Sequence, residues 1–168
     1  MSPGLLLIVR ALHIVAGILW GGGIVALALF VAPSIAAAGP GGGAVMKQIV
    51  QVRKFPVYMM AMATLTVLSG ILLMWSDAHG NENFMRTPFG RAIGVGALLA
   101  LVAVVIGMGF AAPSARRVSK LMASSGGAPD AATAAEIQRL QARMGLLTRV
   151  AAALVFLAAV AMAGARYL

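Results

Sequence analysis

The chain of 168 residues contains no cysteine and only four acidic residues, and charged residues make up only 10% of it. The absence of cysteine excludes disulfides, thiolate metal sites and covalently attached c-type haem within this chain. Soluble domains carry roughly 25% charged residues, whereas 61% of the residues here are hydrophobic. A chain of this composition cannot cover itself with polar surface, so we expect an integral, multi-pass membrane protein.

Four apolar stretches are long enough to cross the hydrocarbon core of a bilayer, which takes roughly 20 residues of α-helix. They comprise residues 5–32, 55–75, 92–112 and 146–165. Helices satisfy their own backbone hydrogen bonds in lipid. The stretches therefore predict an all-α fold, a polytopic membrane four-helix bundle formed by a single transmembrane domain, residues 1–168. The first stretch is too long for a cleaved signal peptide and lacks a basic segment before it.

The net charge of +9 is distributed unevenly among the connections. The side that carries the connections after the first and third stretches holds nine basic residues, whereas the other side holds Arg10, Arg86, Arg91 and Arg166. Basic residues accumulate on the cytoplasmic side of membrane proteins. We therefore expect both chain termini outside. We attribute the basic surplus to topology and to anionic lipid headgroups rather than to nucleic-acid binding.

A short internal repeat relates the two halves of the chain. Residues 30–34 (FVAPS), at the end of the first stretch, match residues 110–114 (FAAPS) at the end of the third. The match favours two parallel helical-hairpin pseudo-repeats. The alternative is shared interface chemistry, an aromatic anchor followed by a proline where the helix leaves lipid.

The first connection is predicted to turn at residues 39–43 and the third at residues 124–129. Each leads into a helix that is predicted to project beyond the bilayer, and Pro56 is predicted to bend the second membrane helix.

The first stretch contains an arginine and a histidine one helical turn apart, Arg10 and His13. An ionisable side chain in hydrocarbon is costly and marks a functional site by default. At about 100° per residue, one broad helix face holds Arg10, His13, Gly17, Trp20 and Gly21. The two glycines predict a slot beside the imidazole for a flat macrocycle. We therefore predict His13 as an axial ligand of haem b, Arg10 as partner of a propionate and Trp20 against the ring.

The same residues also fit a purely structural role. Small residues spaced as Gly17 and Gly21 bring membrane helices close together. An intramembrane histidine can hydrogen-bond across a bundle, and Arg10 can extend to the nearby interface. The third stretch has a similar row of glycines, of which we expect Gly94 and Gly107 to face another helix or a ligand.

Other residues with ligand chemistry lie outside this helix face. The second histidine, His79, forms a loose set with Asp77 and Glu82 in the second connection. Methionines on the later helices can act as a sixth haem ligand or as soft copper(I) ligands, or as adaptable packing residues. No membrane-length stretch contains Asp or Glu, which argues against a carboxylate-based proton pump and against Mg²⁺ or Ca²⁺ chemistry inside the bilayer.

Residues 11–23 (ALHIVAGILWGGG) resemble the first helix of two related groups of bacterial membrane proteins, the HemJ-type protoporphyrinogen oxidases and the CopD-like copper-resistance membrane domains. The resemblance implies a haem-b-linked or metal-linked protein of the bacterial inner membrane, with His13 matching the histidine of the shared motif. HemJ-type enzymes carry a second characteristic histidine and a lysine in later helices. Residues 94–109 contain neither, so the resemblance does not extend to porphyrinogen oxidation.

Three hypotheses for the function follow. The first is a haem-b-binding membrane protein with a redox, porphyrin-handling or metal-handling role. The sequence assigns no catalytic residue, so enzymatic activity is left open. The second is a non-catalytic accessory or structural subunit, whose glycine-rich faces dock onto other membrane subunits or onto a second copy of the chain. The third is a copper or small-solute permease that uses the methionines.

Overall fold

A computed structural model describes residues 1–126 and 129–168, and within them four helices are long and apolar enough to cross a membrane. They extend over Pro3–Ala37, Phe55–Ala78, Pro88–Ser124 and Ala131–Tyr167. No strand occurs in the described part of the chain. The predicted all-α fold with four membrane helices is confirmed, and these helices are what an integral membrane protein requires.

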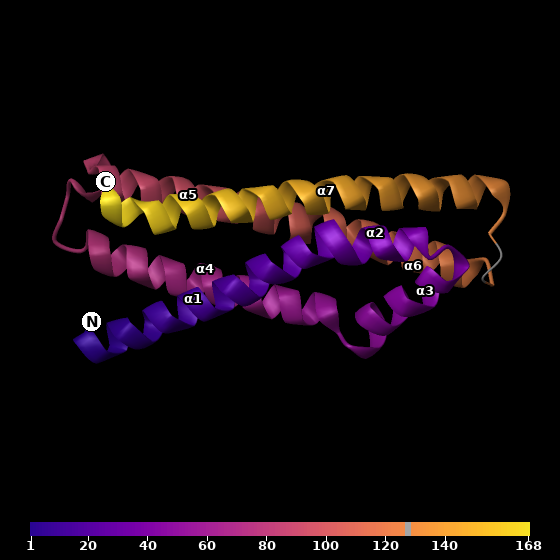
Figure 1. The fold of residues 1–168 in the computed structure, drawn as a ribbon, viewed down its shortest axis with the longest axis horizontal. Coiled ribbons are helices and arrows are strands. Elements are labelled where there is room, and N and C mark those ends of the chain that lie inside the picture. Colours follow the sequence, from indigo (N-terminus) through magenta and orange to yellow (C-terminus); the bar gives the residue numbers. More distant parts are fainter. Residues whose placement is uncertain (127–128) are drawn as a thin grey trace.

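The long helices are divided by short changes of helical register (Figure 1). The first membrane helix consists of α1 (Pro3–Ala26), the π-helical turn η1 (Leu27–Val31) and α2 (Ala32–Ala37). The next segments are α3 (Pro40–Lys47), the π-helical turn η2 (Gln48–Val52), α4 (Phe55–Ala78) and the 3₁₀ turn η3 (Phe84–Arg86). The third membrane helix comprises α5 (Pro88–Val105), the π-helical turn η4 (Ile106–Ala111) and α6 (Ala112–Ser124). The fourth comprises α7 (Ala131–Gly164) and the 3₁₀ turn η5 (Ala165–Tyr167).

The membrane helices pack as two antiparallel hairpins, α1 with α4 and α5 with α7 (Figure 1). Contacts between α1 and α7 join the hairpins. Trp20 of α1 forms the centre of the buried core, and its partners are small residues from the other three helices: Ala63, Ala103, Ala151 and Val155. A single large ring among small side chains lets all four helices approach one another closely.

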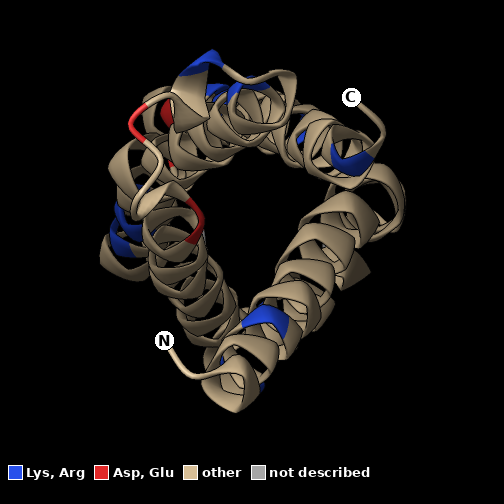
Figure 2. Ribbon diagram, turned by 90° about the vertical axis from the view of Figure 1, so that its left-hand side faces the viewer, with Lys and Arg blue, Asp and Glu red and all other residues tan. Residues whose placement is uncertain are grey.

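The outer surface of the bundle is apolar over most of its length. Leu7, Phe30, Leu98 and Phe156 are each more than half exposed. Figure 2, which looks along the bundle from the end that carries both termini, shows charged residues as short coloured segments on otherwise tan helices. Exposed apolar surface on this scale is unfavourable in water and suited to contact with lipid tails.

The two ends of the bundle differ in character. Both termini and the connection between α4 and α5 lie at one end, here called the terminal end, and α2, α3 and α6 lie toward the other, the basic end (Figure 1). The third and fourth membrane helices contain 37 residues each, well above the roughly 20 that span the hydrocarbon. Their excess length therefore projects beyond the apolar stretches, as predicted.

Helix starts follow local sequence signals. The side chain of Ser2 accepts a hydrogen bond from the backbone of Leu5 at the start of α1, and Thr87 accepts from Gly90 at the start of α5. Asp130 caps α7 by accepting from the amide of Thr133 at 2.7 Å. These side chains satisfy amides that have no partner inside the helix.

Both predicted features of the first connection are wrong in detail. The chain breaks at Gly39, which has φ +58°, but the following glycines already belong to α3. Residues 45–54 do not extend the second membrane helix, because the backbone breaks at Lys54 in the left-handed region, φ +54°. Pro56 lies in the first turn of α4, where a missing N–H is tolerated. It therefore starts the helix rather than bending it.

The two prolines of the internal repeat follow the same backbone feature. The amide of the residue before Pro33 donates to the carbonyl of Leu27, and the amide of the residue before Pro113 donates to the carbonyl of Gly107. These bonds span five residues, as in a π-helix. A proline ring in a regular helix clashes with the carbonyl four residues earlier, and a change of register at that point removes the regular spacing. The similarity of the two five-residue segments therefore includes the backbone as well as the sequence.

Candidate functional site

His13 lies on α1 and faces α4. Its Nδ1 atom is 2.9 Å from the backbone carbonyl oxygen of Thr66 and 3.3 Å from the hydroxyl oxygen of Ser69. A carbonyl oxygen can only accept a hydrogen bond. Nδ1 therefore carries a proton and donates it to Thr66, which links the first two membrane helices. Nε2 is the ring nitrogen that is left for any further partner.

The hydroxyl groups beside His13 are satisfied within α4. Thr66 Oγ1 donates to the carbonyl of Met62 at 2.7 Å, and the hydroxyl of Ser69 donates to the carbonyl of Leu65. Both residues are buried. Among the residues that the structure describes, no buried side-chain nitrogen or oxygen lacks a hydrogen-bond partner. The polar cluster is thus complete without water or a ligand at Thr66 and Ser69.

Gly70 makes room for the imidazole ring. A Cβ atom at this position would lie 2.9 Å from His13 Cε1 and 3.3 Å from Nδ1, closer than ordinary van der Waals contact. Sequence reasoning missed Thr66, Ser69 and Gly70. The signal that could have found them is their spacing of three and four residues, which places small and hydroxyl side chains on one face of the second helix.

The helix-1 glycines are in contact with other helices. A Cβ atom on Gly17 would lie 3.6 Å from the Thr66 methyl group of α4, and one on Gly21 would lie 3.0 Å from a Val155 methyl group of α7. Trp20, only 5% exposed, packs in the core between these contacts. The space that we predicted for a macrocycle beside Gly17 and Gly21 is therefore taken up by side chains of α4 and α7.

Two properties of this site decide how well it fits haem. A histidine that ligates a metal usually donates its other ring N–H to a carbonyl or carboxylate, and His13 has this arrangement. The porphyrin plate, in contrast, does not fit beside the two glycines. The donor nitrogen is suitable, and the predicted position of the ring is not.

The predicted glycine face of the third membrane helix is present only in part. A Cβ atom on Gly94 would meet the end of Met85, and one on Gly96 would lie 2.7 Å from Met162. A Cβ atom on Gly107 would have nothing within 4 Å, so Gly107 does not pack against another helix, and the alternative that it faces a ligand stays a prediction. The methionines near these glycines fill space left by missing side chains, the ordinary packing role of this residue.

Arg10 does not share the hydrogen-bond partners of His13. It lines a hollow of about 420 Å³ at the terminal end, together with Asp77, Asn81, Phe84, Thr87 and Phe89. His79 and Glu82 are not part of this wall. Among the described residues, no three His, Cys, Asp or Glu side chains come together as a metal site, so the loose set of Asp77, His79 and Glu82 is not assembled.

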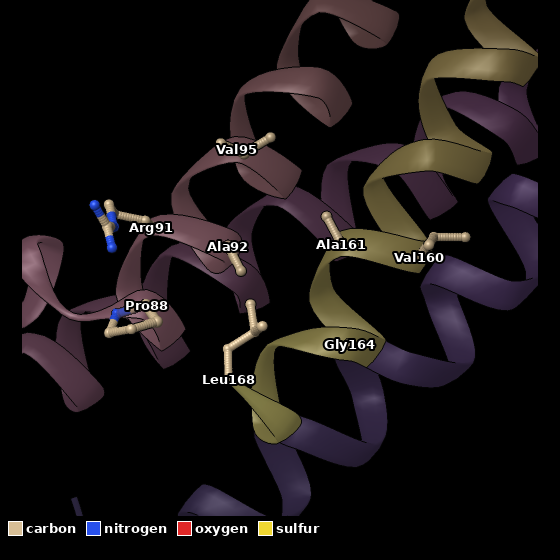
Figure 3. Close-up of a pocket in the computed structure, with 8 residues that line it drawn as sticks. All are labelled: Pro88, Arg91, Ala92, Val95, Val160, Ala161, Gly164 and Leu168. Atoms are coloured by element: carbon tan, nitrogen blue, oxygen red, sulfur yellow. The ribbon is translucent and has the colours of Figure 1, made fainter.

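A second depression, of about 560 Å³, lies between α5 and α7 (Figure 3). Its floor is made of small residues such as Ala92, Ala161 and Gly164, and Val95 and Leu168 contribute to its sides. Arg91 stands at its edge, with the side chain directed away from the groove in Figure 3. Apart from Arg91, the residues that line the groove are apolar, so it offers mainly apolar contact area.

Comparisons with protein-family models, with curated protein sequences and with solved structures find no significant match to this chain. The resemblance of residues 11–23 to HemJ-type and CopD-like first helices therefore stays a prediction. The functional argument depends on the arrangement of the residues themselves.

Proposed function

We propose that the protein is a non-catalytic membrane protein, an accessory or structural subunit of a larger membrane assembly. One observation supports this above others. The three small or polar residues of the helix-1 motif, His13, Gly17 and Gly21, each contact another helix of the same chain. Their spacing is accounted for by helix packing, with no cofactor needed.

The physical basis is the way membrane helices associate. Lipid tails are as apolar as the helices, so association depends on close packing and on interhelical hydrogen bonds. His13 and Gly17 contact α4, whereas Gly21 contacts α7 of the other hairpin. These three residues thus position α1 against α4 within its own hairpin and against α7 of the other hairpin.

Two substitutions of His13 test this role. The amide nitrogen of asparagine lies as many bonds from Cα as Nδ1 does, so His13→Asn keeps a donor for the Thr66 carbonyl. The longer glutamine places its amide nitrogen near the position of Nε2. For a structural role we expect His13→Asn to unfold in detergent close to the wild type. We expect His13→Gln to be destabilised by about 1 kcal/mol, as for loss of one interhelical hydrogen bond.

Equal loss of stability in both variants would contradict the structural role. So would wild-type stability of His13→Gln, because the donor to Thr66 is absent in that variant. Purification of the wild-type protein from membranes under mild detergent, followed by identification of co-purifying membrane subunits, tests the second half of the proposal.

Haem-b binding is the second candidate, because the hydrogen bond from Nδ1 to the Thr66 carbonyl leaves Nε2 available for iron. Haem would supply redox chemistry. His13 would hold it through Nε2, in a position other than the one predicted beside Gly17 and Gly21. The expected result is a Soret band in protein purified from haem-replete cells that is lost in both His13→Asn and His13→Gln. A colourless wild-type protein would overturn this candidate.

We infer further that the protein resides in a bacterial inner membrane with both termini outside. The support is the nine-to-four split of basic residues between the two sides. The basic end would then contact the cytoplasm and anionic lipid headgroups.

A further inference from the structure

The hollow at the terminal end brings two opposite charges to one space. Arg10 comes from α1 and Asp77 from the last turn of α4. The remaining walls come from the connection and from the start of α5: Asn81, Phe84, Thr87 and Phe89. The hollow is open to its surroundings and has a volume of about 420 Å³.

Arg10 and Asp77 line this hollow without forming an ion pair. The ion pair found among the described residues is Arg117–Glu136, at 3.1 Å, on α6 and α7. Near a membrane interface the effective dielectric constant is below that of bulk water, so each charge gains from a nearby counter-charge. A single ligand that carries an anion and a cation would supply both.

The remaining wall of the hollow is held in place by contacts within the chain. Phe84 is only 5% exposed, and its ring packs edge-on against that of Phe89 at 6.0 Å. The hydroxyl of Thr87 donates to the carbonyl of Phe84 at 2.7 Å and accepts from the amide of Gly90 at 2.9 Å. A wall held by these contacts does not need to be ordered when a ligand binds, which favours affinity.

The helix surface around Arg10 indicates where such a ligand comes from. Leu7 and Ile14, three residues before and four after Arg10, lie on the same side of α1. They are 69% and 52% exposed. In a bilayer these side chains contact acyl chains, so the charged hollow is continuous with a lipid-contacting surface.

We propose that this hollow binds the headgroup of a phosphatidylethanolamine-type lipid. The planar guanidinium of Arg10 matches the phosphate, to which it can donate two hydrogen bonds. The carboxylate of Asp77 accepts from the primary ammonium group, and the acyl chains run toward the bilayer centre along Ile14, one turn beyond Arg10. A quaternary ammonium has no N–H to donate, so the site distinguishes ethanolamine from choline headgroups.

Native mass spectrometry of delipidated protein tests this proposal. The protein is titrated with phosphatidylethanolamine, phosphatidylcholine and phosphatidylglycerol of identical acyl chains. We expect the wild type to retain phosphatidylethanolamine best. Arg10→Gln should weaken retention of all three lipids by roughly tenfold or more, the usual effect of losing a hydrogen bond to a charged group. Asp77→Asn should remove the preference for phosphatidylethanolamine and leave phosphate binding in place.

Arg91→Gln is the matched control, because Arg91 is an exposed arginine at the same end that lines the other groove. It should leave lipid preference unchanged. Circular dichroism and gel filtration establish that each variant is folded. Should Arg10→Gln not fold, Arg10→Lys serves in its place, since it keeps the charge, loses the planar fork and should show a smaller loss.

Equal retention of the three lipids by the wild type, or an unchanged preference in Asp77→Asn, would overturn the proposal.

Competition with free phosphoethanolamine distinguishes a lipid headgroup from a soluble zwitterion as the ligand of the hollow. At millimolar concentration we expect phosphoethanolamine to leave bound lipid in place, because it lacks acyl chains that contact Ile14. Displacement of the lipid by micromolar phosphoethanolamine would show that a soluble zwitterion is the ligand. Lipid retention is read independently of subunit association and of haem content, so this proposal and the proposed function can fail separately.

Discussion

At the scale of single residues, the imidazole of His13 depends on backbone groups of α4 more than on side chains. Its acceptor is the carbonyl of Thr66, and its ring occupies the space left by the missing side chain of Gly70. A main-chain acceptor cannot be removed by substitution of residue 66. The position of His13 should therefore be most sensitive to a change at residue 70.

We expect Gly70→Ala to destabilise the bundle by about 1–3 kcal/mol, the usual cost of overpacking a tight contact. The added methyl group would force the ring away from α4 and lengthen the hydrogen bond from Nδ1 to Thr66. Gly22→Ala is the control, because a Cβ atom there has nothing within 4 Å. Unfolding of the two variants in detergent, followed by circular dichroism, measures the difference. Equal stability of the two variants would show that the ring is not confined by Gly70.

A second pair of glycines, both on the third membrane helix, separates close packing from open surface. A Cβ atom on Gly96 would lie 2.7 Å from Met162 and 3.1 Å from the backbone oxygen of Ala158, whereas one on Gly107 has nothing within 4 Å. A backbone atom cannot swing aside. We expect Gly96→Ala to cost about 1–3 kcal/mol and Gly107→Ala to be neutral or slightly stabilising. Destabilisation by Gly107→Ala alone would contradict the packing of this helix.

At the scale of elements, the capping carboxylate of Asp130 predicts a pH dependence for the start of α7. Hydrogen bonds from the backbone amide and the hydroxyl of Thr133 lower the pKa of Asp130 below its ordinary value. The pKa in the folded helix is thus below that in the unfolded chain. The ionised cap stabilises the helix start above the ordinary range of aspartate, and this contribution is lost as the pH falls through the lowered folded pKa.

We therefore expect the first turn of α7 to fray on acidification in the wild type. Asp130→Asn keeps a side-chain oxygen that accepts from Thr133 but cannot titrate. The amide resonance of Thr133, followed by NMR between neutral and acidic pH, should titrate in the wild type and stay constant in the variant. The same pH dependence in both proteins would show that Asp130 does not control this helix start.

The π-helical turns η1 and η4 are elements that the sequence did not predict, although the repeat that locates them was visible. Hydrophobic periodicity does not distinguish an α-helix from one with a single wider turn, because the apolar residues continue through it. The matching prolines Pro33 and Pro113 mark the positions. A proline deep in an apolar helix thus indicates a change of register as well as a possible end of the helix.

At the scale of the whole molecule, the length and apolar composition of the helical stretches determined which parts of the fold could be predicted. The four membrane helices follow from local patterns and are present. The partners of Gly17 and Gly21 could not be predicted, because a glycine face looks the same whether a ligand or another helix fills it. The hollow that contains Arg10 and Asp77 also depends on how distant segments meet. Whether His13, Gly17 and Gly21 of α1 contact a ligand or other helices is therefore decided by the tertiary arrangement.

The proposed orientation of the whole bundle is based on its charge distribution, and the absence of cysteine makes this orientation directly measurable. Glu82 lies in the connection at the terminal end and Ser124 at the end of α6, and both residues are exposed. With the basic end in the cytoplasm, a membrane-impermeant maleimide added to intact cells should label Glu82→Cys and should label Ser124→Cys only after the membrane is permeabilised. Neither position lies in the buried core, so the substitutions leave the fold intact. Labelling of Ser124→Cys in intact cells would reverse the topology and place the charged hollow on the cytoplasmic side.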